Sequence, residues 1–115
     1  MIKIKRIYEP PNKDDGVRIL VDRLWPRSIK KDDSKLHKWL KEIGPSNELR
    51  KWFNHDPQKW QKFKIRYFKE LKSKTILIQY LESISSRSDL TLVYSAKDEL
   101  HNQAVVIKDY LLGKK

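Results

Sequence analysis

The sequence predicts an α/β fold: a small, mostly parallel sheet of about three strands flanked by helices, in a single compact domain spanning residues 1–115. Two apolar runs, residues 17–21 and 90–95, have the composition of strands that are buried on both faces, as strands of parallel sheets are. Most of the chain between them has helical periodicity, and helices between strands favour parallel pairing with right-handed crossovers. A chain of 115 residues is too short for two ordinary domains.

The strands are expected in three places. Near the N-terminus, Ile2 and Ile4 alternate with lysines, which is typical of a strand with one face in water, and two prolines at residues 10–11 end it. The second strand covers residues 17–21, follows a turn at residues 14–16 and cannot continue past Pro26. The third covers residues 90–95, which are rich in strand-forming residues.

The first helix is predicted over residues 34–43, with Asp33 or Ser34 as its N-cap and Gly44-Pro45 as its end. Its apolar positions, at helical spacing, are Leu36, Trp39, Leu40 and Ile43.

The next two helices have clear N-terminal signals. Ser46 can cap a short helix that carries Leu49, Trp52 and Phe53. Asp56 can cap the following one, with a proline at its first position, where the missing N–H costs nothing. A fourth helix is expected around residues 76–84, with apolar positions Ile76, Leu77, Tyr80, Leu81 and Ile84, and a last one around residues 104–112.

The charge of the chain is strongly positive, since 26 Lys and Arg stand against 15 Asp and Glu, a formal net charge of +11. Such a field attracts polyanions, so nucleic acid is a candidate partner, although a lysine-rich surface also suits a protein that binds none. The densest basic segment is the helix predicted within residues 57–74, where Glu70 is the lone acidic residue. Its lysines can lie along phosphates or simply face water.

We expect a cytoplasmic protein without a membrane segment. The chain has no cysteine, which removes disulfides and thiolate chemistry and suits a reducing compartment. No run of about 18 apolar residues could cross a bilayer, and the first residues lack the apolar block of a signal peptide. The sequence leaves the oligomeric state open.

Polar side chains follow the second and third predicted strands at their carboxyl ends. If those strands are parallel neighbours, the two groups share one rim, which is where ligands of α/β sheets gather. The candidate residues are Asp22, Arg23, Trp25 and Arg27 after one strand, and Tyr94, Ser95, Lys97, Asp98, His101 and Asn102 at the end of the other.

These residue types suit anion recognition and proton transfer. Arg23 or Arg27 can hold a phosphate or carboxylate with two parallel hydrogen bonds. His101 is the natural general acid or base, since it titrates nearest neutral pH, and Asp22 or Asp98 can orient it. Ser95 lacks the Gly-x-Ser-x-Gly elbow of serine hydrolases, which argues against a nucleophile.

The same residues also have purely structural interpretations. Arg23 can pair with Asp22 or Asp15 to fix the loop, and Trp25 can belong to the core. Asp98 can be the N-cap of the last helix, with His101 in a solvated first turn. The histidines have no metal-ligand spacing and the chain has no glycine-rich phosphate loop, so we expect no bound metal or cofactor.

Three long segments resemble a known family. They are DGVRILVDRLWPR (residues 15–27), PSNELRKWFNHDP (residues 45–57) and LVYSAKDELHNQA (residues 92–104). Together they closely resemble the YeaO-like branch of the DUF488 family, a domain of unknown function, over nearly the whole chain. The resemblance implies a small cytoplasmic α/β domain and brings no established activity. Its motif positions add Arg50 and His55 to the candidates, because three motifs that each end in polar residues suggest one convergent pocket.

From these observations we expect an enzyme or a ligand-binding domain for a small anion that bears phosphate or carboxylate. Arg23, Arg27 and Arg50 would bind the anion, and His101 or His55 would transfer a proton. Whether the protein is an enzyme stays open. The alternatives are a nucleic-acid-associated module that uses the basic helix within residues 57–74, and an interaction partner without any site.

Overall fold

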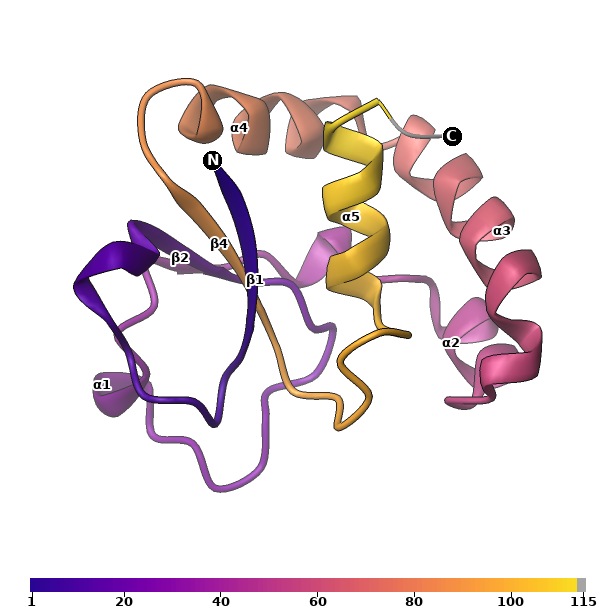
Figure 1. Cartoon of the computed structure of the whole chain (residues 1–115). Helices are drawn as coiled ribbons and strands as arrows, with labels where there is room; N and C mark the ends of the chain where they lie inside the picture. Colours follow the sequence, from indigo (N-terminus) through magenta and orange to yellow (C-terminus); the bar gives the residue numbers. More distant parts are fainter. Residues whose placement is uncertain (114–115) are drawn as a thin grey trace.

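The computed structural model describes residues 1–113, which form an α/β fold around a four-stranded parallel sheet (Figure 1). The strands are β1 (Ile2–Arg6), β2 (Val17–Leu20), β3 (Lys38–Trp39) and β4 (Leu90–Tyr94). Their order across the sheet is β1-β4-β2-β3, so β4 lies between the first two strands of the chain. The register pairs Ile2 with Leu90 and Ile19 with Leu92, which aligns the carboxyl ends of β1, β2 and β4 at one edge.

Helices cover one face of this sheet. They are α2 (Asn47–Phe53), α3 (Trp60–Lys72), α4 (Thr75–Ser85) and α5 (Gln103–Leu111), and Figure 1 shows the last three grouped on one side of the strands. The main core lies beneath them, where Ile19 and Leu92 of the sheet meet Tyr67 and Leu81 of the helices. The segment after β2, which includes the short helix α1 (Lys31–Ser34), covers the other face around Leu20 and Val93.

The helix predicted over residues 34–43 is wrong. Residues 38–39 form the edge strand β3 instead, which pairs with Ile19 and Leu20 and raises the strand count from three to four. The apolar residues of this segment divide between the two faces of the sheet, because Leu36 and Trp39 pack with Leu20 while the next apolar pair joins the main core. That pair is Leu40 and Ile43, and a short 3-10 helix, Lys41–Ile43, links the strand to α2.

The N-terminal signals of the next two helices are confirmed. The Ser46 side chain accepts a hydrogen bond from the Leu49 N–H at 3.1 Å and caps α2. The Asp56 side chain caps a 3-10 turn, Pro57–Lys59, which runs directly into α3. Ser46 also donates to the Glu70 carboxylate at 2.6 Å, so the cap of one helix is anchored to the body of the next.

Two details of the later helices differ from the prediction. In α4 the residues facing the core are Ile78, Leu81 and Ile84, whereas Ile76 is 80% exposed. In α5 the N-cap is Asn102, whose side chain accepts from the Val105 N–H, so Asp98 lies before the helix rather than at its cap. Within residues 1–113, no helix has the length and apolar character needed to cross a membrane.

Candidate anion-binding site

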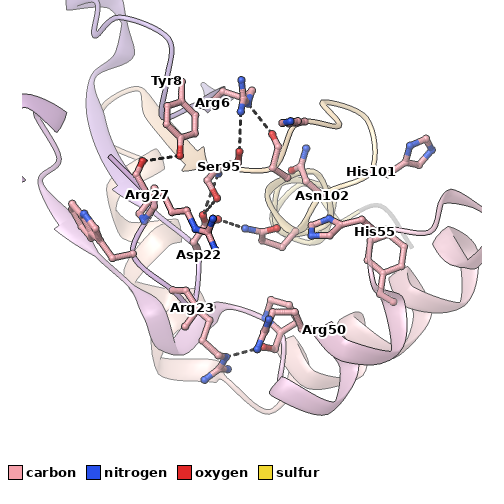
Figure 2. Close-up of a pocket in the computed structure, with 18 of the residues that line it drawn as sticks. Arg6, Tyr8, Asp22, Arg23, Arg27, Arg50, His55, Ser95, His101 and Asn102 are labelled. Atoms are coloured by element: carbon pink, nitrogen blue, oxygen red, sulfur yellow. Dashed lines mark hydrogen bonds between the residues drawn. The ribbon is translucent and has the colours of Figure 1, made fainter. Parts of the chain in front are cut away.

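A cavity of about 450 Å³ opens where the carboxyl ends of β1, β2 and β4 meet the N-terminus of α5 and the end of α2 (Figure 2). This is the edge at which ligands of parallel sheets bind, and the volume suits a small organic molecule. Its lining combines cationic, polar and aromatic residues. They include Arg6, Tyr8, Asp22, Arg23, Trp25, Arg27, Arg50, Phe53, His55, Phe63, Ser95, Lys97, His101, Asn102 and Gln103.

The structure brings together most of the candidate residues. Asp22, Arg23, Trp25 and Arg27 line the cavity after β2, Ser95, His101 and Asn102 line it after β4, and Arg50 and His55 line it from α2 and its end. Two candidates stand apart. Tyr94 is 2% exposed and packs in the main core, and Asp98 does not line the cavity itself but contacts the lining residues His101 and Asn102.

Asp22 is the polar centre of the site. It is 7% exposed, and one oxygen of its carboxylate, Oδ2, accepts hydrogen bonds from the backbone N–H and the hydroxyl of Ser95. The other oxygen, Oδ1, accepts from the side-chain amide of Gln103. Burial raises the pKa of Asp22 above its usual value, and the hydrogen bonds from Ser95 and Gln103 offset part of that rise. The carboxylate therefore joins the ends of β2 and β4 to the first turn of α5.

Two of the arginines hold the walls of the cavity. Arg23 donates from Nε to the Pro45 carbonyl and from Nη2 to the Gly44 carbonyl, each at 2.8 Å. Arg6 donates to the carbonyls of Ser95 and Ala96. The alternative interpretation, in which Arg23 pairs with Asp22 or Asp15, is wrong in its partner, because Arg23 is held by these carbonyls instead. Both arginines therefore have structural partners and still add positive charge to the site.

Arg27 and Arg50 are much less engaged. Arg50 comes from the middle of α2, its Nε is buried without a hydrogen-bond partner, and its Nη2 makes one long contact of 3.4 Å with Asn47. The guanidinium of Arg27 forms no hydrogen bond or ion pair with any residue from 1 to 113, although its carbonyl accepts from the Tyr8 hydroxyl. A buried donor without a partner costs free energy, and a bound acceptor would recover it.

Both candidate histidines lie at the helical side of the cavity. His101 Nδ1 is 2.8 Å from Asp98 Oδ2, so Asp98 rather than Asp22 orients the ring, and the edge of Trp60 packs against it at 5.1 Å. Hydrogen bonds from the Leu100 N–H and from His101 lower the pKa of Asp98. His55 follows α2 in a left-handed backbone conformation, with φ of 56°, which turns the chain sharply at the end of that helix.

Trp25 and Asn102 line the cavity, and their polar groups also form hydrogen bonds that hold the surrounding loops. The Trp25 indole donates to the Ile29 carbonyl at 2.8 Å and packs edge-on against Trp39 at 5.3 Å. The Asn102 side chain uses its oxygen for the cap of α5 and donates from its amide nitrogen to the Asp98 carbonyl at 2.9 Å. Its hydrogen-bonding groups thus hold the loop after β4.

Sequence reasoning missed three polar residues of the lining: Arg6, Tyr8 and Gln103. Arg6 is the last residue of β1, so the rule that located the other strand ends applied to it as well. Gln103 gives no signal in the sequence, because its importance depends on the contact with Asp22. Within residues 1–113, no group of three His, Asp or Glu side chains is arranged to hold a metal ion.

The basic segment around α3 is partly engaged in internal contacts. Lys64 pairs with Asp109 at 2.8 Å, and Lys74 donates to the carbonyls of Glu42 and Gly44. Lys59 donates to the Trp52 carbonyl, and the Arg66 guanidinium lies 4.2 Å from the centre of the Trp52 ring. The remaining basic side chains are Lys62, Lys69 and Lys72, which are exposed.

Comparison with known proteins agrees with the resemblance of the three motifs. The model of a family described as the inactive DUF488-N3 subclade matches residues 1–115. The uncharacterized protein YeaO of Escherichia coli (strain K12) is 46% identical over 110 residues, covering 96% of each chain. The uncharacterized protein Rv3073c of Mycobacterium tuberculosis (strain ATCC 25618 / H37Rv) is 37% identical over 113 residues, covering 98% of this chain and 95% of that one. No solved structure matches the chain.

Proposed function

Because this chain belongs to the inactive DUF488-N3 subclade, we propose that it binds a small anion at the carboxyl edge of its sheet rather than transforming one. The Nε of Arg50 carries this proposal, since it is a buried charged donor with no acceptor among residues 1–113, on a side chain that lines the cavity. A phosphate or carboxylate oxygen is the acceptor that a guanidinium fits best.

The charges around the cavity favour the same class of ligand. Four arginines and Lys97 line it, and Asp22 is the one carboxylate among the described lining residues. That carboxylate accepts three hydrogen bonds from neutral neighbouring groups, and the lining keeps an excess of positive charge even when its charge is counted. In a partly enclosed site, such an excess of positive charge attracts anions more strongly than it would in water.

The apolar part of the lining sets the size and character of the ligand. Trp25, Phe53 and Phe63 face the cavity beside the cationic groups. A bare inorganic anion would leave most of about 450 Å³ unfilled, so the ligand should carry an apolar or aromatic body. The proton-transfer roles of His101, His55 and Asp22 stay predictions.

Replacing Arg50 tests the proposal. Binding of phosphate, phenyl phosphate and citrate is measured by thermal shift and calorimetry, at low and moderate salt. A stabilisation by one anion that persists at moderate salt is expected for the wild type. Arg50→Ala should weaken that binding by about tenfold or more, the loss of one charged hydrogen bond.

Lys51→Ala is the matched control, because Lys51 is the next residue of α2 and is exposed. Its replacement by alanine removes the same charge as Arg50→Ala. Equal losses in the two variants would mean that net charge, and not a built site, attracts the anion. The absence of binding by every anion in the panel would reject the proposed function.

A further inference from the structure

We call Ser95 and Gln103 the floor of the cavity, and Arg27 and Arg50 its rim. The rim offers hydrogen-bond donors, and the floor adds acceptors. Ser95 and Gln103 both line the cavity, and the Gln103 amide donates one hydrogen bond to Asp22. The Ser95 hydroxyl also donates to Asp22 (Figure 2). A carboxylate can only accept hydrogen bonds, so Asp22 dictates the direction of both contacts. The Ser95 hydroxyl proton and one of the two Gln103 amide N–H groups therefore point toward Asp22.

What these residues can still offer a ligand is acceptor capacity. Ser95 Oγ keeps its lone pairs, and Gln103 Oε1 accepts no hydrogen bond from the described residues. The backbone N–H of Ser95 also donates to Asp22. Ser95 Oγ and Gln103 Oε1 thus give the floor two hydrogen-bond acceptors, beside the donating guanidiniums of Arg27 and Arg50 at the rim.

We propose that the cavity selects anions that also carry a hydroxyl or amino group, whose proton is accepted by Ser95 Oγ and Gln103 Oε1. This inference rests on the proposed function, because it describes the second end of the same ligand. The chemical class is a hydroxy- or amino-substituted aromatic or apolar body that bears a phosphate or carboxylate. Asp22, Ser95 and Gln103 are then specificity-determining residues, and Asp22 acts through the other two.

Isosteric probes test the polarity of the floor. The panel contains phenyl phosphate and the ortho, meta and para isomers of hydroxyphenyl phosphate and fluorophenyl phosphate. Fluorine resembles a hydroxyl in size but donates no proton. Calorimetry should show at least one hydroxy isomer that binds tenfold or more tightly than its fluoro counterpart.

Three variants of the intact chain test whether Ser95, Gln103 and Asp22 cause the preference for hydroxy over fluoro isomers. Ser95→Ala should reduce the hydroxy-to-fluoro ratio to below threefold, whereas Ser86→Ala, an exposed serine after α4, should leave the ratio unchanged. Asp22→Asn is nearly isosteric and adds a donor, which lets Gln103 turn its N–H groups into the cavity. In that variant the preference for the hydroxy isomers should fall or invert.

The outcomes separate this inference from the proposed function. Hydroxy isomers that bind no better than fluoro isomers, while phenyl phosphate binds, would overturn the accepting floor and leave the anion site standing. An unchanged ratio in both Ser95→Ala and Asp22→Asn would also overturn it. If no aryl phosphate binds at all, the proposed function fails and the inference fails with it.

Discussion

At the scale of single residues, Asp15 and Arg18 form an ion pair that is almost withdrawn from water. They are 6% and 3% exposed, and Arg18 Nη1 lies 2.7 Å from Asp15 Oδ2. Lys5 of β1 adds a second cation at 3.1 Å, so this cluster joins β1 to β2 through their side chains. Burial alone would raise the pKa of Asp15, but hydrogen bonds from the Asn12 N–H, Lys5 and Arg18 outweigh it and lower the pKa.

Asp15→Asn should destabilise the protein by about 3 kcal/mol at neutral pH, because Arg18 would stay buried without its carboxylate. The folded pKa lies below the ordinary value of 3.8, so this stability is complete above that value and is lost as the pH falls through the folded pKa. Urea unfolding at a series of pH values should show the gap between wild type and variant closing only below about pH 4. Asp14→Asn, at the exposed neighbouring residue, should cost almost nothing; a similar loss there would contradict this explanation.

Residue type and position predicted much of the candidate site. Asp22, Arg27 and Ser95 follow strand ends, and the rule that ligands gather there needs no contact information. The partners of each side chain were not predictable in this way. Whether Arg23 serves a ligand or the backbone depends on where the Pro45 carbonyl lies, and that position is set by tertiary structure.

At the scale of elements, the segment of residues 34–43 shows where periodicity is ambiguous. Its apolar spacing fits a helix, but the same spacing arises when a chain crosses the edge of a sheet and supplies side chains to both faces. Trp39 Nε1 donates to the Asp22 carbonyl at 2.6 Å, and the Leu40 N–H donates to the Leu20 carbonyl at 2.9 Å. The helices with capping signals were predicted correctly, because a cap is a local interaction whereas strand pairing is not.

The entry into β2 depends on Gly16. Its φ is 64° and its ψ is −133°, a backbone conformation that residues other than glycine rarely adopt. A Cβ added to Gly16 would also lie 2.8 Å from the Asp89 carbonyl carbon, which is too close. Gly16→Ala should therefore cost about 3 kcal/mol or more and lower the melting temperature clearly. Gly113→Ala is the matched control, since that glycine also has a positive φ, of 74°, but no atom within 4 Å of the added Cβ. Equal melting temperatures for wild type and Gly16→Ala would show that this turn can rearrange freely.

At the scale of the whole molecule, positive charge occurs in two arrangements. The formal net charge of +11 belongs to the whole chain, whereas the cavity gathers four arginines in one place. Long-range attraction of polyanions would follow from the first arrangement, and the proposed binding of a small anion would follow from the second. The two respond differently to salt, because exposed charges are screened much more than partly buried ones.

Duplex DNA should bind weakly, with an affinity that falls steeply as salt rises. If the exposed lysines of α3 contact phosphates, Lys62→Glu combined with Lys69→Glu should reduce the slope of log affinity against log salt by roughly one unit for each lost contact. Fluorescence anisotropy with a labelled duplex measures this slope. Lys13→Glu with Lys35→Glu makes the same change of charge at other exposed positions, and an equal effect would assign the binding to net charge alone.

The central position of β4 governs how the chain must be assembled on the ribosome. β1 and β2 do not pair with each other, and both pair with residues 90–94. Ile2 at the start of the chain therefore cannot pair until Leu90 has been synthesised. A nascent chain that has emerged only as far as α4 leaves β1 without a partner strand and one edge of β2 unpaired, which is the state that chaperones recognise and proteases remove. Because the same strand also delivers Ser95 to Asp22, the cavity and the sheet are completed together, and a chain interrupted before β4 has neither.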